Sequence, residues 1–257
     1  MMVSLGTSLS SGPDPRPLLE RLESSPRPAV VQYPAAEDAE ARVELSGRVL
    51  VNWAAKTANL LDVEGLTTGS RAVVDLPAGW KSLAVALGAL WTGVELLPCP
   101  TDAQPGEAES ADAVLTDSPE AWAEHPGTLI AVSPGATDTE FGADLPAHAV
   151  DLSAEVRQQA DQFLLPAPDL SPGTLPSLVQ DAGGDAAQES AAGEWISEQS
   201  RGTAVAAAGR RLDADLLLAA VTAWDALRPI VLVPAGSLAE LDEAARQALS
   251  EEGLTAS

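Results

Sequence analysis

Residues 71–98 read RAVVDLPAGWKSLAVALGALWTGVELLP, and this stretch decides the fold. Its first part, residues 71–76, is a short apolar run that ends at Pro77 and is typical of a buried strand. Apolar residues then recur at helical spacing over residues 79–92, and a second apolar run follows at residues 94–98. Strands that alternate with amphipathic helices in this way predict a mostly parallel sheet.

The same alternation continues on both sides of this stretch. Further strands are predicted at residues 29–33, 42–45, 113–116, 128–132, 203–207 and 230–233, with residues 42–45 as the hairpin partner of residues 29–33. Further helices are predicted at residues 18–23, 49–62 and 238–249, and after Asp213. The fold class is therefore α/β, with layered, mostly parallel sheets and flanking helices. We expect Trp53, Trp80 and Trp91 to be substantially buried, although the face that carries Trp80 and Trp91 is also able to line a pocket.

Composition divides the chain into four parts. Residues 1–17 are rich in Ser, Pro and Gly, lack the features of a secretory signal, and are predicted to be a flexible N-terminus. Residues 18–165 form a first α/β block, and residues 195–257 form a second, smaller one. Between them, residues 166–194 contain many prolines and glycines and are predicted to be a linker or mobile loop.

The charge excludes several classes of partner. The chain has 14 basic and 38 acidic residues, a net charge of −24, so nucleic acid and anionic membrane surfaces are not expected to bind. Residues 101–200 contain 19 acids and a single base, Arg157, which makes −18 of that total. The ordinary interpretation is a solvated acidic surface, and the functional one is a surface that docks a basic protein partner. A homo-oligomer is left open.

Few residues point to catalysis or to a cofactor. The single cysteine, Cys99, is unable to form an internal disulfide and is expected to be a small buried packing residue rather than a nucleophile. His125 and His148 are not at metal-ligand spacing, and no Gly-rich phosphate motif follows a strand. We therefore expect no metal, no cofactor and no assigned catalytic residue. Without an apolar run of roughly 18 residues, we expect no membrane span and a cytoplasmic location.

A series of short motifs in the first block follows the order known from one enzyme family. They are Glu44-Leu45-Ser46, Ala58-Asn59-Leu60-Leu61, Gly69-Ser70-Arg71-Ala72-Val73, Leu76-Pro77, Trp91-Thr92-Gly93-Val94, Pro98, and Ala111 to Thr116-Asp117. This order resembles the N-terminal part of the AMP-binding, acyl-adenylate-forming enzymes, which include acyl-CoA synthetases and adenylation domains. The chain also looks like short proteins of high-GC bacteria that are distant relatives of these enzymes. The resemblance implies a truncated acyl-CoA synthetase N-terminal fold.

The resemblance also implies where a nucleotide would bind. Ser200, Arg201, Gly202 and Thr203 stand where the family has a Gly/Ser/Thr-rich phosphate loop, but in a degenerate form. The family polarises the acyl phosphate with a lysine on a mobile C-terminal domain, and this sequence has no lysine after Lys81. Around the loop, Arg201, Arg210 and Arg211 are the only substitute cluster of positive charge that the sequence offers, and a plain surface role is the favoured interpretation of these arginines.

These observations leave three hypotheses for the function. The leading one is a non-catalytic relative with a degenerate nucleotide site and a binding or scaffolding role. The second is an acyl-adenylate-forming ligase with a rebuilt site, and the third is an accessory subunit that docks a basic partner. The sequence therefore favours a protein without catalytic activity.

Overall fold

The computed structural model describes residues 16–34, 42–99, 110–142, 144–179, 204–207, 210–233, 246–247 and 250. In this part of the chain, strands and helices alternate as the apolar pattern predicts. The strands are β1 (Pro28–Gln32), β2 (Val43–Ser46), β3 (Arg71–Asp75), β4 (Glu95–Pro98), β5 (Ala113–Thr116), β6 (Thr128–Ala131), β7 (Ala149–Asp151), β8 (Ala204–Ala207) and β9 (Ile230–Val233). The helices are α1 (Leu18–Glu23), α2 (Gly47–Val63), α3 (Trp80–Thr92), α5 (Leu152–Glu155) and α6 (Ala214–Asp225), with short 3-10 helices η1 (Pro119–Trp122), η2 (Val156–Gln158) and η3 (Leu175–Ser177).

Five parallel strands form the larger sheet, in the order β4-β3-β5-β6-β7. Val73 of β3 lies beside Leu97 of β4 on one side and Val114 of β5 on the other. All three side chains are buried, as is Leu129 of β6. Strands of a parallel sheet that are buried on both faces have continuous apolar runs, which explains the unbroken runs in this sequence.

The smaller sheet joins distant parts of the chain in the order β2-β1-β9-β8. β2 pairs antiparallel with β1, which confirms the predicted hairpin. On the other side of β1, Val31 lies beside Val231 of β9 in a parallel pair, and β8 continues the sheet parallel to β9. Strands from residues 18–165 and from residues 195–257 therefore share one sheet, while their division into two separate blocks stays a prediction.

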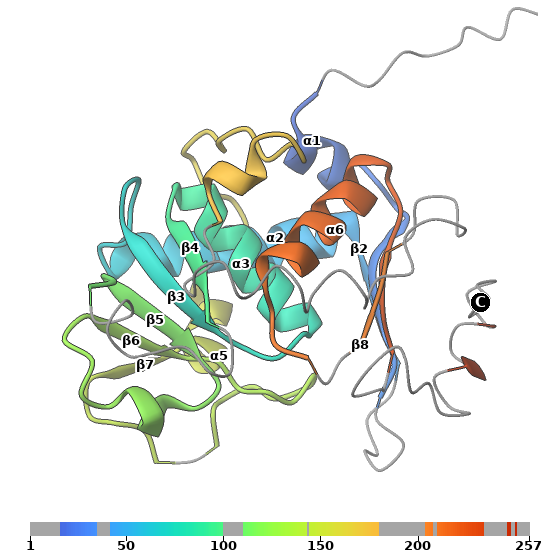
Figure 1. Ribbon diagram of the computed structural model, residues 1–257. Helices are drawn as coiled ribbons and strands as arrows, with labels where there is room; N and C mark the ends of the chain where they lie inside the picture. Colours follow the sequence, from blue (N-terminus) through green and yellow to red (C-terminus); the bar gives the residue numbers. More distant parts are fainter. Residues whose placement is uncertain are drawn as a thin grey trace, which may run out of the picture.

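Two helices lie between the sheets and complete a layered α/β fold. Figure 1 shows α2 and α3 in the middle, with the larger sheet on the left and the smaller one on the right. One hydrophobic core includes Val30 and Leu232 of the smaller sheet and Val74 and Ile130 of the larger one. The predicted fold class is therefore confirmed.

The contact between α2 and α3 depends on one glycine. α2 begins after Ser46, whose side chain caps its first turn, and α3 ends at Gly93, which has a left-handed φ of 82°. A Cβ added to Gly88 of α3 would lie 2.6 Å from the carbonyl oxygen of Ala54 and 2.6 Å from the Cβ of Thr57, both on α2. The missing side chain thus lets the two helices approach each other.

The three tryptophans predicted to be substantially buried all lie in the core or pack against it. Trp80 is buried, packs edge to face on Trp53 with ring centroids 5.2 Å apart, and donates its indole N–H to the carbonyl of Ala136 at 3.0 Å. Trp53 and Trp91 are only partly buried and pack against the edge of the core. The tryptophan face of α3 therefore belongs mainly to the core.

The last strand of the larger sheet and the short helix after it were not predicted. β7 and α5 follow a segment of mixed polarity, and neither has the apolar periodicity that marks a strand or helix in sequence. The helix predicted at residues 238–249 lies outside the described residues, apart from residues 246–247.

The described part of the predicted linker is packed against the core. Leu170 and Leu175 are buried, and the backbone N–H of Leu96 donates to the carbonyl of Leu178 at 2.9 Å. Residues 180–194 lie outside the described residues, and the mobility expected of residues 166–194 stays a prediction.

Candidate functional site

The carboxyl ends of β3 and β5 meet where the order of the larger sheet reverses. β4 follows β3 in the chain and lies on one side of it, whereas β5 lies on the other side. In open parallel sheets, the crevice outside the carboxyl ends of the strands at such a reversal is where ligands bind. Asp75 ends β3 and is paired with Thr116, which ends β5. This edge of the sheet is therefore the first place to expect a ligand site.

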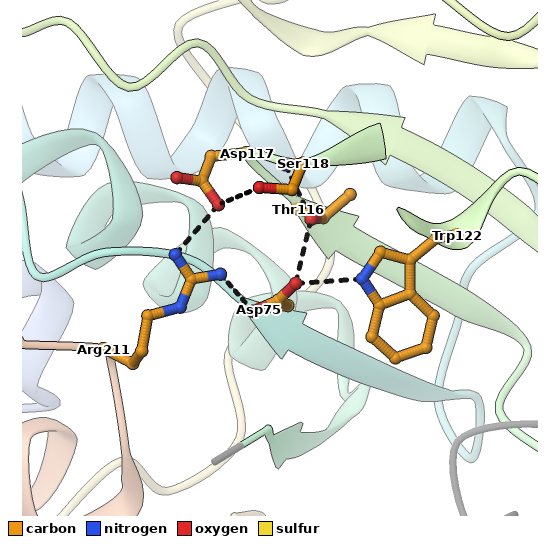
Figure 2. Close-up of polar contacts among 6 residues, drawn as sticks. All are labelled: Asp75, Thr116, Asp117, Ser118, Trp122 and Arg211. Atoms are coloured by element: carbon orange, nitrogen blue, oxygen red, sulfur yellow. Dashed lines mark hydrogen bonds and ion pairs between the residues drawn. The ribbon is translucent and has the colours of Figure 1, made fainter. Parts of the chain in front are cut away.

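Six side chains form a polar cluster at this edge, as Figure 2 shows. The polar cluster consists of Asp75, Thr116, Asp117, Ser118, Trp122 and Arg211. The guanidinium of Arg211 binds two carboxylates, because Nη1 donates to Asp117 Oδ1 at 2.9 Å and Nη2 donates to Asp75 Oδ1. The other oxygen of Asp75 accepts from the indole N–H of Trp122 at 2.9 Å and from the hydroxyl of Thr116 at 3.2 Å. Both oxygens of Asp75 thus have donors within the cluster.

Arg211 reaches the cluster because the segment before α6 adds to the end of β3. The backbone N–H of Ala78 donates to the carbonyl of Arg210 at 2.7 Å, and that of Leu212 donates to the carbonyl of Leu76 at 2.8 Å. The side chain of Asp213 then caps α6 by accepting from the backbone N–H of Leu216 at 2.8 Å. These two backbone hydrogen bonds connect the segment before α6 to the polar edge of the larger sheet.

The cluster is half-buried and has a formal net charge of −1. The side chains of Arg211, Asp75 and Asp117 are 26%, 18% and 16% exposed. Burial lowers the pKa of Arg211, but the hydrogen bonds and charges of Asp75 and Asp117 outweigh it and hold the pKa above its usual range. The guanidinium is therefore charged, and two carboxylates of the same chain surround it.

The charged side chains of this cluster act on the pKa of the nearby Cys99 thiol. Burial raises the pKa of the Cys99 thiol, the carboxylate of Asp75 raises it further, and the positive charge of Arg211 opposes both. Since the thiolate is the reactive form of cysteine, this environment disfavours a nucleophilic role. The prediction that Cys99 is a buried packing residue is confirmed.

The predicted phosphate-loop residues are not among those that the structure describes. Ser200, Arg201, Gly202 and Thr203 lie directly before β8, outside the described residues. Of the substitute cluster of arginines, Arg211 lies in the polar cluster described above. Its neighbour Arg210 forms an ion pair with Asp213. Both described arginines are thus bound by acidic side chains of this chain.

A second polar group, which the sequence analysis missed, lies at the carboxyl end of β6. Lys81 of α3 donates to the hydroxyl of Ser133 at 2.8 Å and to the carbonyl of Asp138 at 3.0 Å. The Ser133 hydroxyl lies 2.7 Å from that of Ser153, and both serines are buried. The small cavity beside them has room for about one water molecule, so this group orders the ends of β6 and β7 rather than holding a substrate.

Signals for this second group are weak in the sequence. Ser133 directly follows the apolar run of β6, and polar residues at the carboxyl ends of parallel strands share one edge of the sheet. Ser153, however, belongs to α5, which the apolar pattern did not predict.

The two histidines occupy separate loops. His125 is partly buried, accepts from the backbone N–H of Gly127 at 3.1 Å and packs edge to face on Trp122, whereas His148 is exposed. Within the described ranges, no three His, Cys, Asp or Glu side chains are placed to hold a metal ion. In the same part of the chain, no helix has the length and apolar character needed to cross a bilayer.

Comparison with known proteins finds one related sequence and several similar folds. No family model matches the chain. A TIGR03089 family protein from Mycobacterium tuberculosis (strain ATCC 25618 / H37Rv) is 33% identical over 159 residues, which are 57% of this chain and 61% of that protein. The chain thus spans less than two thirds of this relative.

Two solved structures of one enzyme share the fold over most of the chain. They are the unliganded O-succinylbenzoate coenzyme A synthetase from Bacillus subtilis and the same enzyme in complex with an acyl-adenylate intermediate. Both have a TM-score of 0.58 over 93% of this chain, at 12% and 13% identity, and the match covers 48% and 60% of their chains. In fold, this chain therefore resembles the N-terminal domain of the AMP-binding acyl-CoA synthetases.

Proposed function

We propose that this protein is a non-catalytic relative of the acyl-adenylate-forming enzymes. In this proposal its nucleotide site is degenerate, and its remaining role is binding or scaffolding. The likeness in fold supports the link to these enzymes. The observation that carries the rest is the ion-paired state of Arg211, which Asp75 and Asp117 hold at the polar edge of the larger sheet.

The argument is electrostatic. An adenylating enzyme must hold a polyanionic nucleotide and then stabilise the negative charge that develops at the acyl phosphate. Backbone N–H groups of a glycine-rich loop and positive side chains normally provide this stabilisation. To serve a phosphate, Arg211 would have to leave two half-buried carboxylates, which would then repel the nucleotide. Arg210 would likewise have to leave a carboxylate, because it is paired with Asp213.

The two lysines of this sequence are also engaged in structural contacts. Lys56 of α2 forms an ion pair with Asp161 at 2.8 Å. Lys81 of α3 donates to the hydroxyl of Ser133 and to a backbone carbonyl. Neither lysine lies at the polar edge between β3 and β5, so neither supports the role that the catalytic lysine has in the family.

Thermal unfolding with and without ligands tests this proposal. The full chain is heated with magnesium and ATP, with AMP, with coenzyme A and with a non-hydrolysable acyl-adenylate mimic. A ligand at 100 times its dissociation constant would add about 2.7 kcal/mol to the stability and raise the midpoint visibly. We expect no rise with the nucleotides. A rise with AMP or ATP that is lost in Arg201→Ala would instead support a ligase with a rebuilt site.

The role as an accessory subunit is the second candidate, and a specific surface favours it. Among the described residues, the large apolar side chains that are exposed are Val49, Val63, Leu164 and Leu165. Leu164 and Leu165 lie in the segment after η2, which is bound to α2 by the ion pair of Lys56 with Asp161.

A further inference from the structure

A segment after η2 crosses the surface without burying any of its side chains completely. Residues 159–165, here named the strap, belong to no helix or strand, and each of them is exposed or only partly buried. The chain is anchored on both sides of the strap, because Val156 before it lies in the hydrophobic core and Ala167 after it packs against that core. The strap itself therefore depends on other contacts for its position.

Side chains of α2 hold the strap by its backbone carbonyls. The ammonium of Lys56 donates to the carbonyl of Gln159. The amide of Asn59, about one turn further along α2, donates to the carbonyls of Ala160 and Gln162 at 3.1 Å and 2.9 Å. These contacts take the place of the backbone pairing that a strand or helix would supply. The strap thus keeps its course only while α2 holds it.

The far end of the strap is held by Trp91 of α3. The indole N–H of Trp91 donates to the carbonyl of Leu165 at 3.1 Å, and its ring packs edge to face on Phe163 with centroids 5.8 Å apart. Lys56 adds an ion pair with Asp161 at 2.8 Å. Two helices therefore hold the strap along its whole length.

Water has access to most of these contacts. The side chain of Asp161 is 62% exposed in its ion pair, and Leu164 and Leu165 are 91% and 53% exposed. Hydrogen bonds and ion pairs that water can replace add little to stability. Release of the strap would expose the ring of Phe163 and part of the ring of Trp91, whereas unfolding exposes the core of both sheets. Release should therefore cost far less free energy than unfolding.

We propose that the strap is a conformational device that opens as a unit while the two sheets and their helices stay folded. Lys56, Asn59 and Trp91 hold it closed, and its opening frees these side chains together with the ring of Phe163. Proteins open locally in such cooperative units where few apolar contacts are buried. The device goes beyond the proposed function, because none of the contacts described for the strap involves the polar cluster.

Hydrogen exchange of tryptophan indole N–H groups, followed by NMR on the full chain, tests this proposal. The indole of Trp91 is bound to the strap, whereas that of Trp224 donates to the carbonyl of Ala29 in the core at 2.9 Å. The two groups thus report the opening of the strap and the opening of the core. We expect the Trp91 indole to exchange about tenfold faster than that of Trp224 or more, yet slower than a free indole. Low urea should speed only Trp224, because the effect of urea scales with the surface exposed.

A mild change in the core separates local opening from unfolding. Ile230 of β9 is fully buried, so Ile230→Val destabilises the core in the same way whether the strap is open or closed. It should speed the exchange of the Trp224 indole by about twofold to tenfold and leave that of Trp91 unchanged.

Two changes on α2 test whether the strap opens as a unit. Lys56→Met and Asn59→Ala each remove donors to residues 159–162, away from the bond of Trp91 to Leu165. If the strap opens as a unit, each should nevertheless speed exchange of the Trp91 indole by about threefold or more. Asn52→Ala, the same substitution about two turns earlier on α2, is the matched control and should leave this rate unchanged.

The opposite results overturn the proposal. If Trp91 follows Trp224 in urea and in Ile230→Val, the strap opens only when the core unfolds. If the Trp91 indole exchanges at the rate of a free indole, the strap is not held closed. An unchanged Trp91 rate in Lys56→Met or Asn59→Ala shows that the strap does not open as a unit, and an equal rise in Asn52→Ala assigns the effect to α2 as a whole. The thermal unfolding experiment measures nucleotide binding separately.

Discussion

The guanidinium of Arg211 lies 2.9 Å from the carboxylate of Asp117, although 94 residues separate them in the chain. Asp117 follows β5 of the larger sheet, and Arg211 precedes α6, which packs on β8 and β9 of the smaller one. Their contact thus connects the edge of one sheet to the edge of the other. It also occupies a positive group that a nucleotide site at this edge would need.

Replacing Arg211 should destabilise the protein because it leaves two half-buried carboxylates without their partner. We expect Arg211→Met to lower the free energy of unfolding by about 1–3 kcal/mol, below the 3–5 kcal/mol typical of a fully buried pair. Urea denaturation of Arg211→Met, Asp117→Asn and the double variant measures the coupling between the two side chains. Arg42→Met is the control, since its pair with Glu44 is exposed and should contribute only about 0–1 kcal/mol. Equal losses in Arg211→Met and Arg42→Met would contradict the assigned role.

The stability should depend on pH through Cys99. Its pKa is raised in the folded protein, so the folded thiol keeps its proton at pH values where the unfolded thiol, with a pKa of about 8.5, loses it. The stabilisation is therefore complete below the unfolded pKa and is lost as the pH rises above it. The measurement is the difference in unfolding free energy between the wild type and Cys99→Ala from neutral to alkaline pH. This difference should shrink with rising pH, and a constant or growing difference would show that the thiol is not desolvated.

The core position of Trp80 gives a third prediction. Trp80→Ala removes a buried ring together with its hydrogen bond to Ala136, and should lower the free energy of unfolding by about 3–5 kcal/mol. Trp91→Ala removes a ring that is only partly buried and should have a smaller effect. The midpoints of urea unfolding compare the two variants. A larger loss of stability in Trp91→Ala than in Trp80→Ala would contradict the core position of Trp80.

Adding a side chain at Gly88, where α2 and α3 approach each other closely, should destabilise the protein. Gly88→Ala places a methyl group 2.6 Å from the backbone oxygen of Ala54, so the helices must separate, at a cost of about 1–3 kcal/mol or more. Gly79→Ala is the matched control, because the nearest atom to its added methyl group would be 3.7 Å away. Thermal unfolding of both variants should show a lower midpoint for Gly88→Ala alone.

The strands and helices of the core could be predicted from sequence because their apolar patterns are local. The run of β3 and the periodicity of α3 each lie within a few residues, so both predictions were right to within one or two positions. β7 has only three residues and no such run, so its pairing with β6 supplies its structure. The pairing of β1 with β9 likewise has no local signal, because the paired residues are about 200 positions apart in the chain.

The polar cluster could be predicted from sequence to a smaller extent than the fold. Asp75 and Asp117 stand at or just after predicted strands, a position that sequence shows, but the order of strands in the sheet decides that they meet. Arg211 was recognised as a positive residue near the phosphate-loop position. Its pairing with both carboxylates depends on the backbone contacts of residues 210–212 with residues 76–78, for which the sequence has no local signal.

The most direct test of the central claim is ATP–pyrophosphate exchange by the purified chain. The assay contains magnesium and a panel of short, long and aromatic carboxylic acids. Because Arg211 is bound to Asp75 and Asp117, and the loop Ser200 to Thr203 contains one glycine and one arginine, we predict no exchange above background with any acid. Exchange above background that disappears in Arg201→Ala or Arg211→Ala would contradict a non-catalytic role and establish a ligase with a rebuilt site.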